Sequence, residues 1–378
     1  MRFNVTCKSF RNAALAVSKV VSSKNTLNIL ENFLIEVKDQ QLFITGSDSD
    51  CTLTSHIDVA EADGQLSFCV SARRLVDLLK VLPDQGITFE VNPDTFEMKI
   101  ESPEGLYHLN AISGDNFPAF SVDDDDAQNA ATFTLSARSI AQGCHATVFA
   151  VGNDDYRPMM KGVYFDVKTD QIVYVATDTH KLVRFIDNRE APGVQISCIV
   201  PEKPANIMAS IFDGSDETVT FTINRKSALV ESQSYSFRFS FLQGRFPDYN
   251  RVIPQDTPYC LEADRDAFAA AVRRVSIISD ATCGLIKFKV SPENVMVKIE
   301  DNGIGAAGRE QFACSYNGPE LIIGFNGAYV NDFLQHIACD QLCVDLTDAS
   351  RAGMFRPVEN IEGTNLVMLL MPMNVDKF

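Results

Sequence analysis

Phe3-Asn-Val-Thr-Cys-Lys-Ser-Phe10 recurs in related form twice more along this chain, as Phe133-Thr-Leu-Ser-Ala-Arg-Ser-Ile140 and as Leu261-Glu-Ala-Asp-Arg-Asp-Ala-Phe268. Each copy reads as a short alternating strand followed by the start of a helix. The copies lie roughly 130 residues apart, a spacing too long for a solenoid repeat and suited to a whole domain. The copies share no catalytic cluster, so the triplication indicates an architecture rather than an active site.

A second strand-helix unit lies halfway through each copy. The three units are Leu66–Leu79, Ile196–Met208 and Leu321–Leu334. The apolar residues that follow each strand have helical spacing in the first and third units, as in Val330, Phe333 and Leu334. Each copy is therefore predicted to carry two helices.

Between the helices the pattern is that of antiparallel strands. Residues 163–167 and 172–176 flank a Lys-Thr-Asp turn and read as a hairpin. Residues 33–37 with 42–46, and 285–290 with 295–299, repeat the hairpin in the other two copies. Runs of strands interrupted by single helices predict an α+β fold with largely antiparallel sheets.

The repeat also sets the expected domain boundaries. Asp123-Asp-Asp-Asp126 reads as a solvated linker before the second copy, and Pro254-Gln-Asp-Thr-Pro258 precedes the third. We therefore expect three domains, at residues 1–124, 125–256 and 257–378. A length of 378 residues gives each enough chain to bury a core.

Composition narrows the class of protein. Phe is abundant (26 residues) and Trp is absent, so the aromatic cores are expected to be built from Phe. No apolar run approaches the roughly 18 residues that span a bilayer, and the N-terminal residues lack the apolar stretch of a signal peptide. The expected location is therefore the cytoplasm, without a membrane partner.

The ten cysteines are scattered, and only Cys339 and Cys343 lie close together in sequence. No C-x-x-C pair indicates a structural zinc site, and the expectation is reduced cysteines that act as small core hydrophobes. No metal ligand set and no cofactor are predicted.

Charge is distributed unevenly. The whole chain carries −17, which argues against a nucleic-acid partner if it is averaged over the surface. The six predicted helical segments, however, hold eleven basic and five acidic residues, or +6, which leaves −23 for the strands and loops. If the helices face one way, one surface is basic and can neutralise phosphates without reading sequence. The alternative is a chance split, because helices often carry Lys and Arg for propensity alone. The segments counted are residues 8–21, 72–80, 136–149, 202–212, 264–278 and 326–338.

Several motifs suggest catalysis but fail on context. Gly303–Gly308 matches G-x-G-x-x-G, yet a strand-like segment follows it where a dinucleotide site needs a helix. Asp301–Gly305 resembles the ATP lid of histidine-kinase-type ATPases, yet the preceding helix lacks the Asn that such a site requires. The five histidines form no metal pattern, and no G-x-S-x-G elbow is present.

Three segments stand out because the repeats do not share them. They are Ala176–Val183, Gly244–Pro254 and Val367–Val375. Taken singly they read as a turn, an interdomain linker and a terminal strand. Together they suggest a cleft in which adaptable methionine side chains accept several partner peptides, with His180 and Arg251 at its polar edges.

With these segments the chain resembles the bacterial sliding clamp, the β subunit of the replicative DNA polymerase, over its full length. The resemblance also rests on Thr26–Leu30, Ser71–Arg74, Gly324-Phe-Asn326 with Tyr329, and Met371-Pro-Met373. It implies a non-enzymatic processivity factor for DNA replication, a head-to-tail homodimer of six domains whose helices line a hole filled by duplex DNA. Its expected partners are the replicative polymerase, the clamp loader and other clamp-binding proteins that carry short hydrophobic peptides.

The resemblance also implies site residues. The peptide cleft would use Met160, Thr177, Thr179, His180, Lys181, Leu182, Pro247, Arg251, Val252, Asn326, Tyr329, Leu370, Met371, Pro372 and Met373. DNA contacts would fall on Lys24, Arg73, Arg157 and Lys203, and the dimer contact on Tyr107 and Leu109 against Ile277 and Ile278.

This chain departs from the family pattern at several of these positions. Thr179 and Lys181 stand where Gly and Arg are usual, and a lysine keeps the charge but loses the planar fork. Glu202 replaces a common basic residue, Asn374 replaces a frequent Arg, and the tail continues to Phe378. Two rival functions remain at this stage: an ATP-dependent enzyme that uses the Asp301–Gly308 loop, and a monomeric scaffold protein that does not bind DNA.

Overall fold

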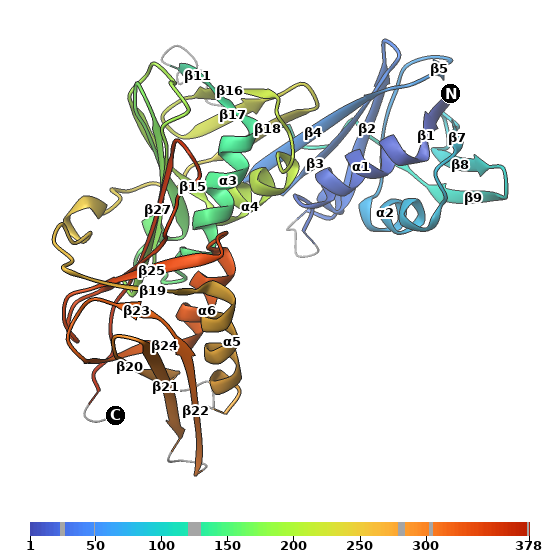
Figure 1. Ribbon diagram of the computed structural model, residues 1–378. Helices are drawn as coiled ribbons and strands as arrows, with labels where there is room; N and C mark the ends of the chain where they lie inside the picture. Colours follow the sequence, from blue (N-terminus) through green and yellow to red (C-terminus); the bar gives the residue numbers. More distant parts are fainter. Residues whose placement is uncertain (23–26, 49, 120–129, 279–283, 302–304, 376–377) are drawn as a thin grey trace. The chain divides into compact units, whose positions relative to one another are not determined.

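The computed structural model describes residues 1–378 except 23–26, 49, 120–129, 279–283, 302–304 and 376–377. Its described part holds six α-helices, two in each copy of the sequence repeat, as predicted (Figure 1). They are α1 (Cys7–Ser18), α2 (Ala72–Val81), α3 (Ala137–Thr147), α4 (Glu202–Ile211), α5 (Arg265–Ser276) and α6 (Gly327–His336).

The repeated strand-to-helix transition has a common cause, which is an N-cap side chain at the junction. Thr6 accepts a hydrogen bond from the backbone N–H of Ser9, and Ser136 accepts one from Ser139. Asp264 does the same for Ala267, with a distance of 2.8 Å. Each cap satisfies a helix N–H that lacks an intrahelical partner, so the chain leaves the strand at the same point in all three copies.

The strands form four antiparallel sheets. One of the two smaller sheets has five strands, in the spatial order β5 (Glu61–Ala62), β1 (Arg2–Thr6), β7 (Gly86–Val91), β8 (Glu97–Ser102) and β9 (Gly105–Asn110). The other has four strands, in the order β22 (Ala306–Ala313), β21 (Asn294–Asp301), β20 (Leu285–Val290) and β24 (Leu321–Asn326).

The two larger sheets have nine strands each. One runs β10 (Ile112–Ser113), β6 (Leu66–Ser71), β2 (Asn32–Lys38), β3 (Gln41–Ser47), β4 (Cys51–Asp58), β18 (Tyr235–Ser240), β17 (Ser227–Glu231), β16 (Thr218–Ile223) and β11 (Ala131–Ser136). The other runs β15 (Ile196–Pro201), β12 (Gly162–Val167), β13 (Ile172–Thr177), β14 (Lys181–Asp187), β27 (Thr364–Leu370), β26 (Gly353–Pro357), β25 (Gln341–Leu346), β19 (Tyr259–Asp264) and β23 (Ser315–Tyr316).

All three predicted hairpins are confirmed as β2–β3, β12–β13 and β20–β21. The α+β class with antiparallel sheets is confirmed as well. Helices pack in pairs on these sheets: α1 lies beside α2 and crosses β3 and β4, and α5 lies beside α6 and crosses β21 and β22 (Figure 1).

The described residues gather into two compact units, Met1–Ile140 with Ile207–Phe241, and Ala141–Asn206 with Leu242–Phe378. Each unit contains one nine-stranded sheet that joins strands from two copies of the repeat. In the first unit β4 pairs with β18, so that Leu53 lies opposite Phe237. In the second, β14 pairs with β27 over seven residue pairs, from Lys181 opposite Leu370 to Asp187 opposite Thr364.

Phenylalanine builds the cores, as the composition predicts. Phe3 and Phe89 lie directly opposite each other on β1 and β7, with ring centroids 4.9 Å apart. Phe133 and Phe221 form the equivalent pair on β11 and β16, at 5.2 Å. These side chains are at most 4% exposed, so the repeat extends to the packing of the core.

The prediction that all cysteines are reduced is wrong for one pair. Cys260 and Cys343 form a disulfide between β19 and β25, although 83 residues separate them. Of the remaining eight, seven lie among the described free thiols, and Cys7, Cys51, Cys69 and Cys144 are buried as expected. The sequence separation hid the pair, because only strand register brings these two residues together.

Candidate functional site

The turn between β13 and β14 is held by its own side chains. Asp178 Oδ1 accepts hydrogen bonds from the backbone N–H groups of His180 (2.9 Å) and Lys181 (2.8 Å). Thr177 Oγ1 donates to the Lys181 carbonyl at 2.7 Å. The turn places Thr179 at φ +80° and leaves Thr179 and His180 exposed. These hydrogen bonds fix the backbone from which the His180 side chain extends.

Lys181 is buried beneath this turn rather than displayed on it, with its side chain 7% exposed. Its ammonium lies 3.6 Å from Asp178 Oδ2 and 3.7 Å from Asp332 Oδ2. It also lies 4.3 Å from the centroid of the Tyr329 ring, within the range of a cation–π contact. Lys181 therefore links the turn to α6 by charge.

Tyr329 and Asn326 position the start of α6 against the turn. Asn326 Oδ1 caps the helix by accepting from the N–H groups of Ala328 (2.9 Å) and Tyr329 (3.3 Å). The half-buried Tyr329 ring stacks with the His180 ring at a centroid distance of 6.4 Å. Burial raises the pKa of the Tyr329 phenol, and the charge and hydrogen bond of Asp178 raise it further, so the phenol stays neutral here.

The segment after β27 completes the group. Met371 N–H donates to the His180 carbonyl at 2.9 Å, and Met373 N–H donates to the Gly324 carbonyl at 2.8 Å. Met371 is 51% exposed, and Met373 is half-buried. A Cβ on Gly324 would lie only 2.4 Å from the Val375 side chain, so this glycine lets the segment pass close over β24.

The last residue of the tail lies against β21. Phe378, the last residue, places its ring centroid 5.7 Å from the Lys298 ammonium on β21. Asp376 and Lys377 lie outside the described residues. The end of the chain is thus at the four-stranded sheet.

Residues 244–254 form a strip with two faces. Phe246, Tyr249 and Ile253 point inward and join a buried cluster with Leu182 and with residues of β13, β15 and β27. Tyr249 Oη donates to Asp166 Oδ2 at 2.8 Å. The exposed residues Pro247, Arg251 and Val252 lie between the inward ones, so they share the outer face.

The predicted cleft residues divide accordingly. The turn, α6 and the C-terminal segment bring a first group together: Thr177, Thr179, His180, Lys181, Asn326, Tyr329, Leu370, Met371, Pro372 and Met373. Met160 lies close to this group. A Cβ atom placed on Gly152 would be 3.4 Å from Met160 Cβ and also 3.4 Å from Asp178 Cα, so Gly152 adjoins both residues. Leu182 is buried in the adjoining cluster, and Pro247, Arg251 and Val252 lie on the outer strip.

Sequence reasoning missed Asp178 and Asp332, which hold Lys181 in place. Asp178 had a readable signal, because an Asp directly after a strand often accepts hydrogen bonds from backbone N–H groups a few residues on and so stabilises a turn. Asp332 had none, because it lies 151 residues further along the sequence than Lys181 and reaches it only through the pairing of β14 with β27.

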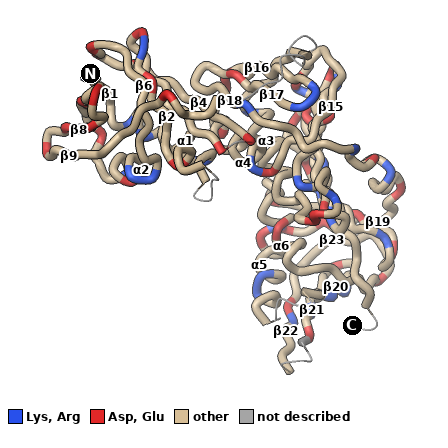
Figure 2. Tube along the Cα trace, turned by 180° about the vertical axis from the view of Figure 1, so that it is seen from behind, with Lys and Arg blue, Asp and Glu red and all other residues tan. Residues whose placement is uncertain are grey.

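Counted over the helix bounds that the structure gives, the six helices hold ten basic and four acidic residues, so their net charge is still +6. Basic residues are visible on α2 and α5 (Figure 2). Several arginines are partly neutralised by ion pairs, as in Arg138 with Asp216 and Arg274 with Glu310. A hollow of about 390 Å³ between α5 and α6 has Arg265, Arg273 and Arg274 in its lining, together with Asp266.

The four predicted DNA contacts lie in different settings. Arg73 on α2 is 92% exposed and 3.8 Å from Asp77. Arg157 is exposed beside Asp154, before a short 3-10 turn, and Lys203 is half-buried on α4. Lys24 lies outside the described residues.

The predicted dimer residues lie at sheet edges or beside them. Tyr107 and Leu109 belong to β9, which pairs on one side only among the described strands. Ile277 and Ile278 follow α5 and are 77% and 37% exposed. Ile278 packs near Gly308 on β22, another strand with a single described neighbour.

The G-x-G-x-x-G segment connects two strands, as expected. Asp301 at the end of β21 lies opposite Ala306 at the start of β22, while residues 302–304 are outside the described part. The segment therefore does not open onto a helix, the arrangement that a dinucleotide site requires.

Comparison with known proteins decides the family. Three family models match in succession: the N-terminal domain of the DNA polymerase III beta subunit at residues 1–121, its central domain at 134–248 and its C-terminal domain at 250–374. The chain belongs to the DNA polymerase III beta subunit family. The clamp fold of three domains and the resemblance noted in the sequence are thereby confirmed.

Relatives in this family match from end to end. The beta sliding clamps of Haemophilus influenzae and of Escherichia coli K12 are 26% and 27% identical, and each alignment covers 99% of this chain and 100% of the relative. Two solved clamps, from Pseudomonas aeruginosa and Bartonella birtlesii, are 25% and 27% identical, with TM-scores of 0.89 and 0.88. Each covers 99% of this chain and is matched over 100% of its own length, and both were solved bound to griselimycin.

In this member of the clamp family, no helix among the described residues is long and apolar enough to cross a membrane.

Proposed function

We propose that this protein is a cytoplasmic sliding clamp, a non-enzymatic processivity subunit that encircles duplex DNA and tethers the replicative polymerase. Its division into domains at 1–124, 125–256 and 257–378 follows the sequence repeat. Two chains associate head to tail, so that Tyr107 and Leu109 of one chain meet Ile277 and Ile278 of the next. The DNA contacts are Lys24, Arg73, Arg157 and Lys203.

The observation that carries this proposal is the C-terminal methionine segment in its setting. Met371 is exposed, while its backbone is fixed to the His180 carbonyl and that of Met373 to Gly324. Beside it the His180 and Tyr329 rings are stacked, and the Lys181 ammonium lies over the Tyr329 ring. Fixed backbone with exposed, adaptable side chains suits a surface that takes short hydrophobic peptides from several partners.

Charge supports the DNA side of the proposal. The helices carry +6 in a chain of −17, so the remaining residues carry −23. Phosphates are repelled by an acidic surface and attracted by a basic one, so duplex DNA is favoured only where helices face it. Binding of this kind is independent of sequence, as sliding requires.

Encirclement is tested by loading the protein onto nicked circular DNA with its clamp loader and then linearising half of the sample. The expected result is retention on the circle and loss from the linear DNA, because a closed ring can leave only over an end. Equal loss from both forms would contradict encirclement. Retention on both forms would indicate ordinary electrostatic binding, and it too would contradict the proposal.

A further inference from the structure

Two neighbouring strands of the C-terminal region carry four potential metal ligands on one face. Cys260 and Glu262 alternate along β19, and Cys343 and Asp345 alternate along β25. The register places Cys260 opposite Asp345 and Glu262 opposite Cys343. The two sulfurs therefore occupy one diagonal of a square, and the two carboxylates occupy the other.

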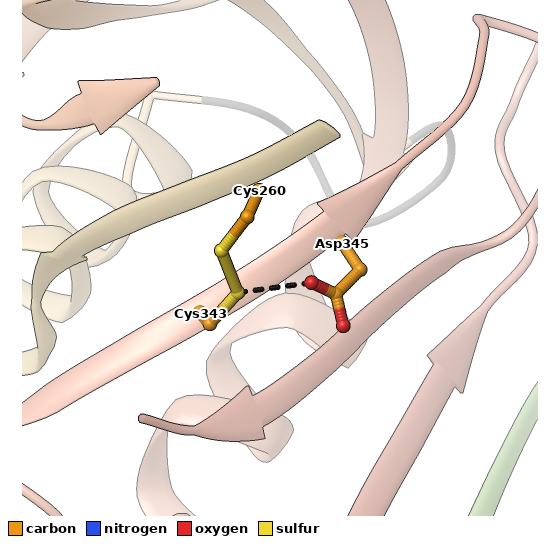
Figure 3. A group of neighbouring side chains, drawn as sticks. All are labelled: Cys260, Cys343 and Asp345. Carbon is orange, nitrogen blue, oxygen red and sulfur yellow. Dashed lines mark hydrogen bonds between the residues drawn. A yellow bond between two sulfur atoms is a disulfide. The ribbon is translucent and has the colours of Figure 1, made fainter. Parts of the chain in front are cut away.

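Three of the four potential ligands, Cys260, Cys343 and Asp345, are already close together (Figure 3). The Cα atoms of Cys260 and Cys343 are 6.2 Å apart, and their sulfurs are joined in a disulfide. Asp345 Oδ1 lies 3.0 Å from Cys343 Sγ, and Glu262 Oε1 lies 3.9 Å from Cys260 Sγ. One ligand atom from each of Cys260, Cys343 and Asp345 falls within 4.8 Å of the other two.

The Asp345 carboxylate is also held in place by an arginine of the next strand, β26. Arg356 on β26 donates from Nε to Oδ2 at 2.7 Å and from a terminal guanidinium nitrogen to Oδ1 at 3.1 Å. Asp345 is only 4% exposed, and Cys343 is fully buried. Carboxylates that bind metal ions are usually hydrogen-bonded by a second group as well, because that group fixes the direction in which the carboxylate points.

We propose that Cys260 and Cys343, when reduced, form with Asp345 and Glu262 a binding site for Zn²⁺. Two sulfurs and two carboxylate oxygens are ligands that Zn²⁺ accepts in tetrahedral geometry. With Zn–S bonds of about 2.3 Å the sulfurs would stand about 3.8 Å apart, which needs only the broken S–S bond and small side-chain rotations.

The site forms in two steps, reduction of the disulfide and then binding of the metal ion. A phosphine reductant gives two electrons to the disulfide and becomes a phosphine oxide with oxygen from water, while the two sulfurs each gain a proton. Zn²⁺ then binds as both thiols release their protons and become thiolate ligands. The disulfide and the metal are thus alternative links between β19 and β25.

The test uses the full chain, reduced with tris(2-carboxyethyl)phosphine, freed of metal and titrated with Co²⁺ and then Zn²⁺. We expect one equivalent of Co²⁺ to produce a thiolate-to-cobalt absorption band, and one equivalent of Zn²⁺ to abolish it. Cys260→Ser should lose the band. Glu262→Gln, an exposed substitution that leaves the core intact, removes a direct ligand and should weaken Co²⁺ binding by at least the roughly tenfold that loss of an outer-shell partner costs.

The matched control is Cys314→Ser, which removes another half-buried thiol from the same region and should bind as the unmodified chain does. The untreated, disulfide-bonded chain should give no band. The proposal would be overturned by the absence of the band in the reduced chain, by its persistence in Cys260→Ser, or by equal binding to the oxidised form. Circular dichroism of each variant establishes that it is folded.

Discussion

At the scale of single residues, Thr179 shows a conflict between side chain and backbone. It is β-branched, yet its φ is +80°, a region in which such residues are strained. The turn enforces this value through the hydrogen bonds that Asp178 accepts from His180 and Lys181. Glycine adopts this conformation without strain.

Thr179→Gly should therefore stabilise the protein. The left-handed penalty of about 1–2 kcal/mol is removed, and the greater backbone entropy of glycine returns about 0.5–1 kcal/mol. We expect the melting temperature to rise by roughly 1–3 °C in a calorimetric scan. Asn188→Gly, at an exposed turn without positive φ, serves as the control, and an equal gain there would refute the explanation by strain.

Tyr249 makes the free energy of unfolding depend on pH in the alkaline range. Burial raises the pKa of its phenol, and its hydrogen bond to Asp166 raises the pKa further. An unfolded tyrosine ionises near pH 10, so the contribution is complete below that pH. Above it the unfolded state loses its proton and the folded state does not, so the free energy of unfolding falls by about 1.4 kcal/mol per pH unit.

Tyr249→Phe should lower stability at pH 8 by about 1 kcal/mol, through the lost hydrogen bond, and should flatten the decline between pH 10 and pH 11. Melting temperatures measured at half-unit intervals of pH would show both effects. Tyr156→Phe, at a side chain that is 95% exposed, should keep the slope of the unmodified chain. An unchanged slope in Tyr249→Phe would disprove the assignment.

At the scale of elements, the C-terminal segment after β27 is held by backbone contacts while its methionine side chains remain free to adapt. Met371→Ala combined with Met373→Ala should therefore leave the fold and the dimer intact. We expect the affinity for the replicative polymerase to fall about tenfold or more, since two flexible apolar contacts are lost. Surface plasmon resonance with the polymerase from the same cell measures this.

Ile361→Ala removes another apolar side chain, 53% exposed, before the opposite end of β27 and should leave that affinity unchanged. Equal affinities for the double variant and the unmodified chain would remove the methionines from the partner site.

The elements were largely predictable because their signals are local. Strand alternation, helix periodicity and capping residues such as Thr6 and Asp264 all act within a few residues. The joining of β4 to β18 and of β14 to β27 was not predictable, because strand pairing depends on residues far apart in sequence. The same limit hid the Cys260–Cys343 pair, and it hid Asp332 as a partner of Lys181.

At the scale of the whole molecule, β9 and β22 each have a single described neighbour, so each leaves one edge open. Ile277 precedes Ile278, which packs near Gly308 of the second of these strands, and is 77% exposed. Such an exposed apolar residue fits a contact between chains. Ile277→Asp should therefore convert a dimer, of twice 41.7 kDa, into a single chain of 41.7 kDa.

Light scattering coupled to size exclusion gives these masses directly. Val81→Asp places the same charge at a residue that is 79% exposed on α2, outside the proposed contact, and should remain dimeric. A dimeric Ile277→Asp variant would exclude this residue from the interface.

The two nine-stranded sheets have a mechanical consequence. Where successive repeats meet within the chain, the junction is a continuous ladder of hydrogen bonds, seven residue pairs long between β14 and β27. Separating such a junction requires shearing many bonds at once and exposing the core beneath them. In a closed assembly of two chains, the places of least resistance are therefore the two seams between chains. A loading factor would therefore act at these seams.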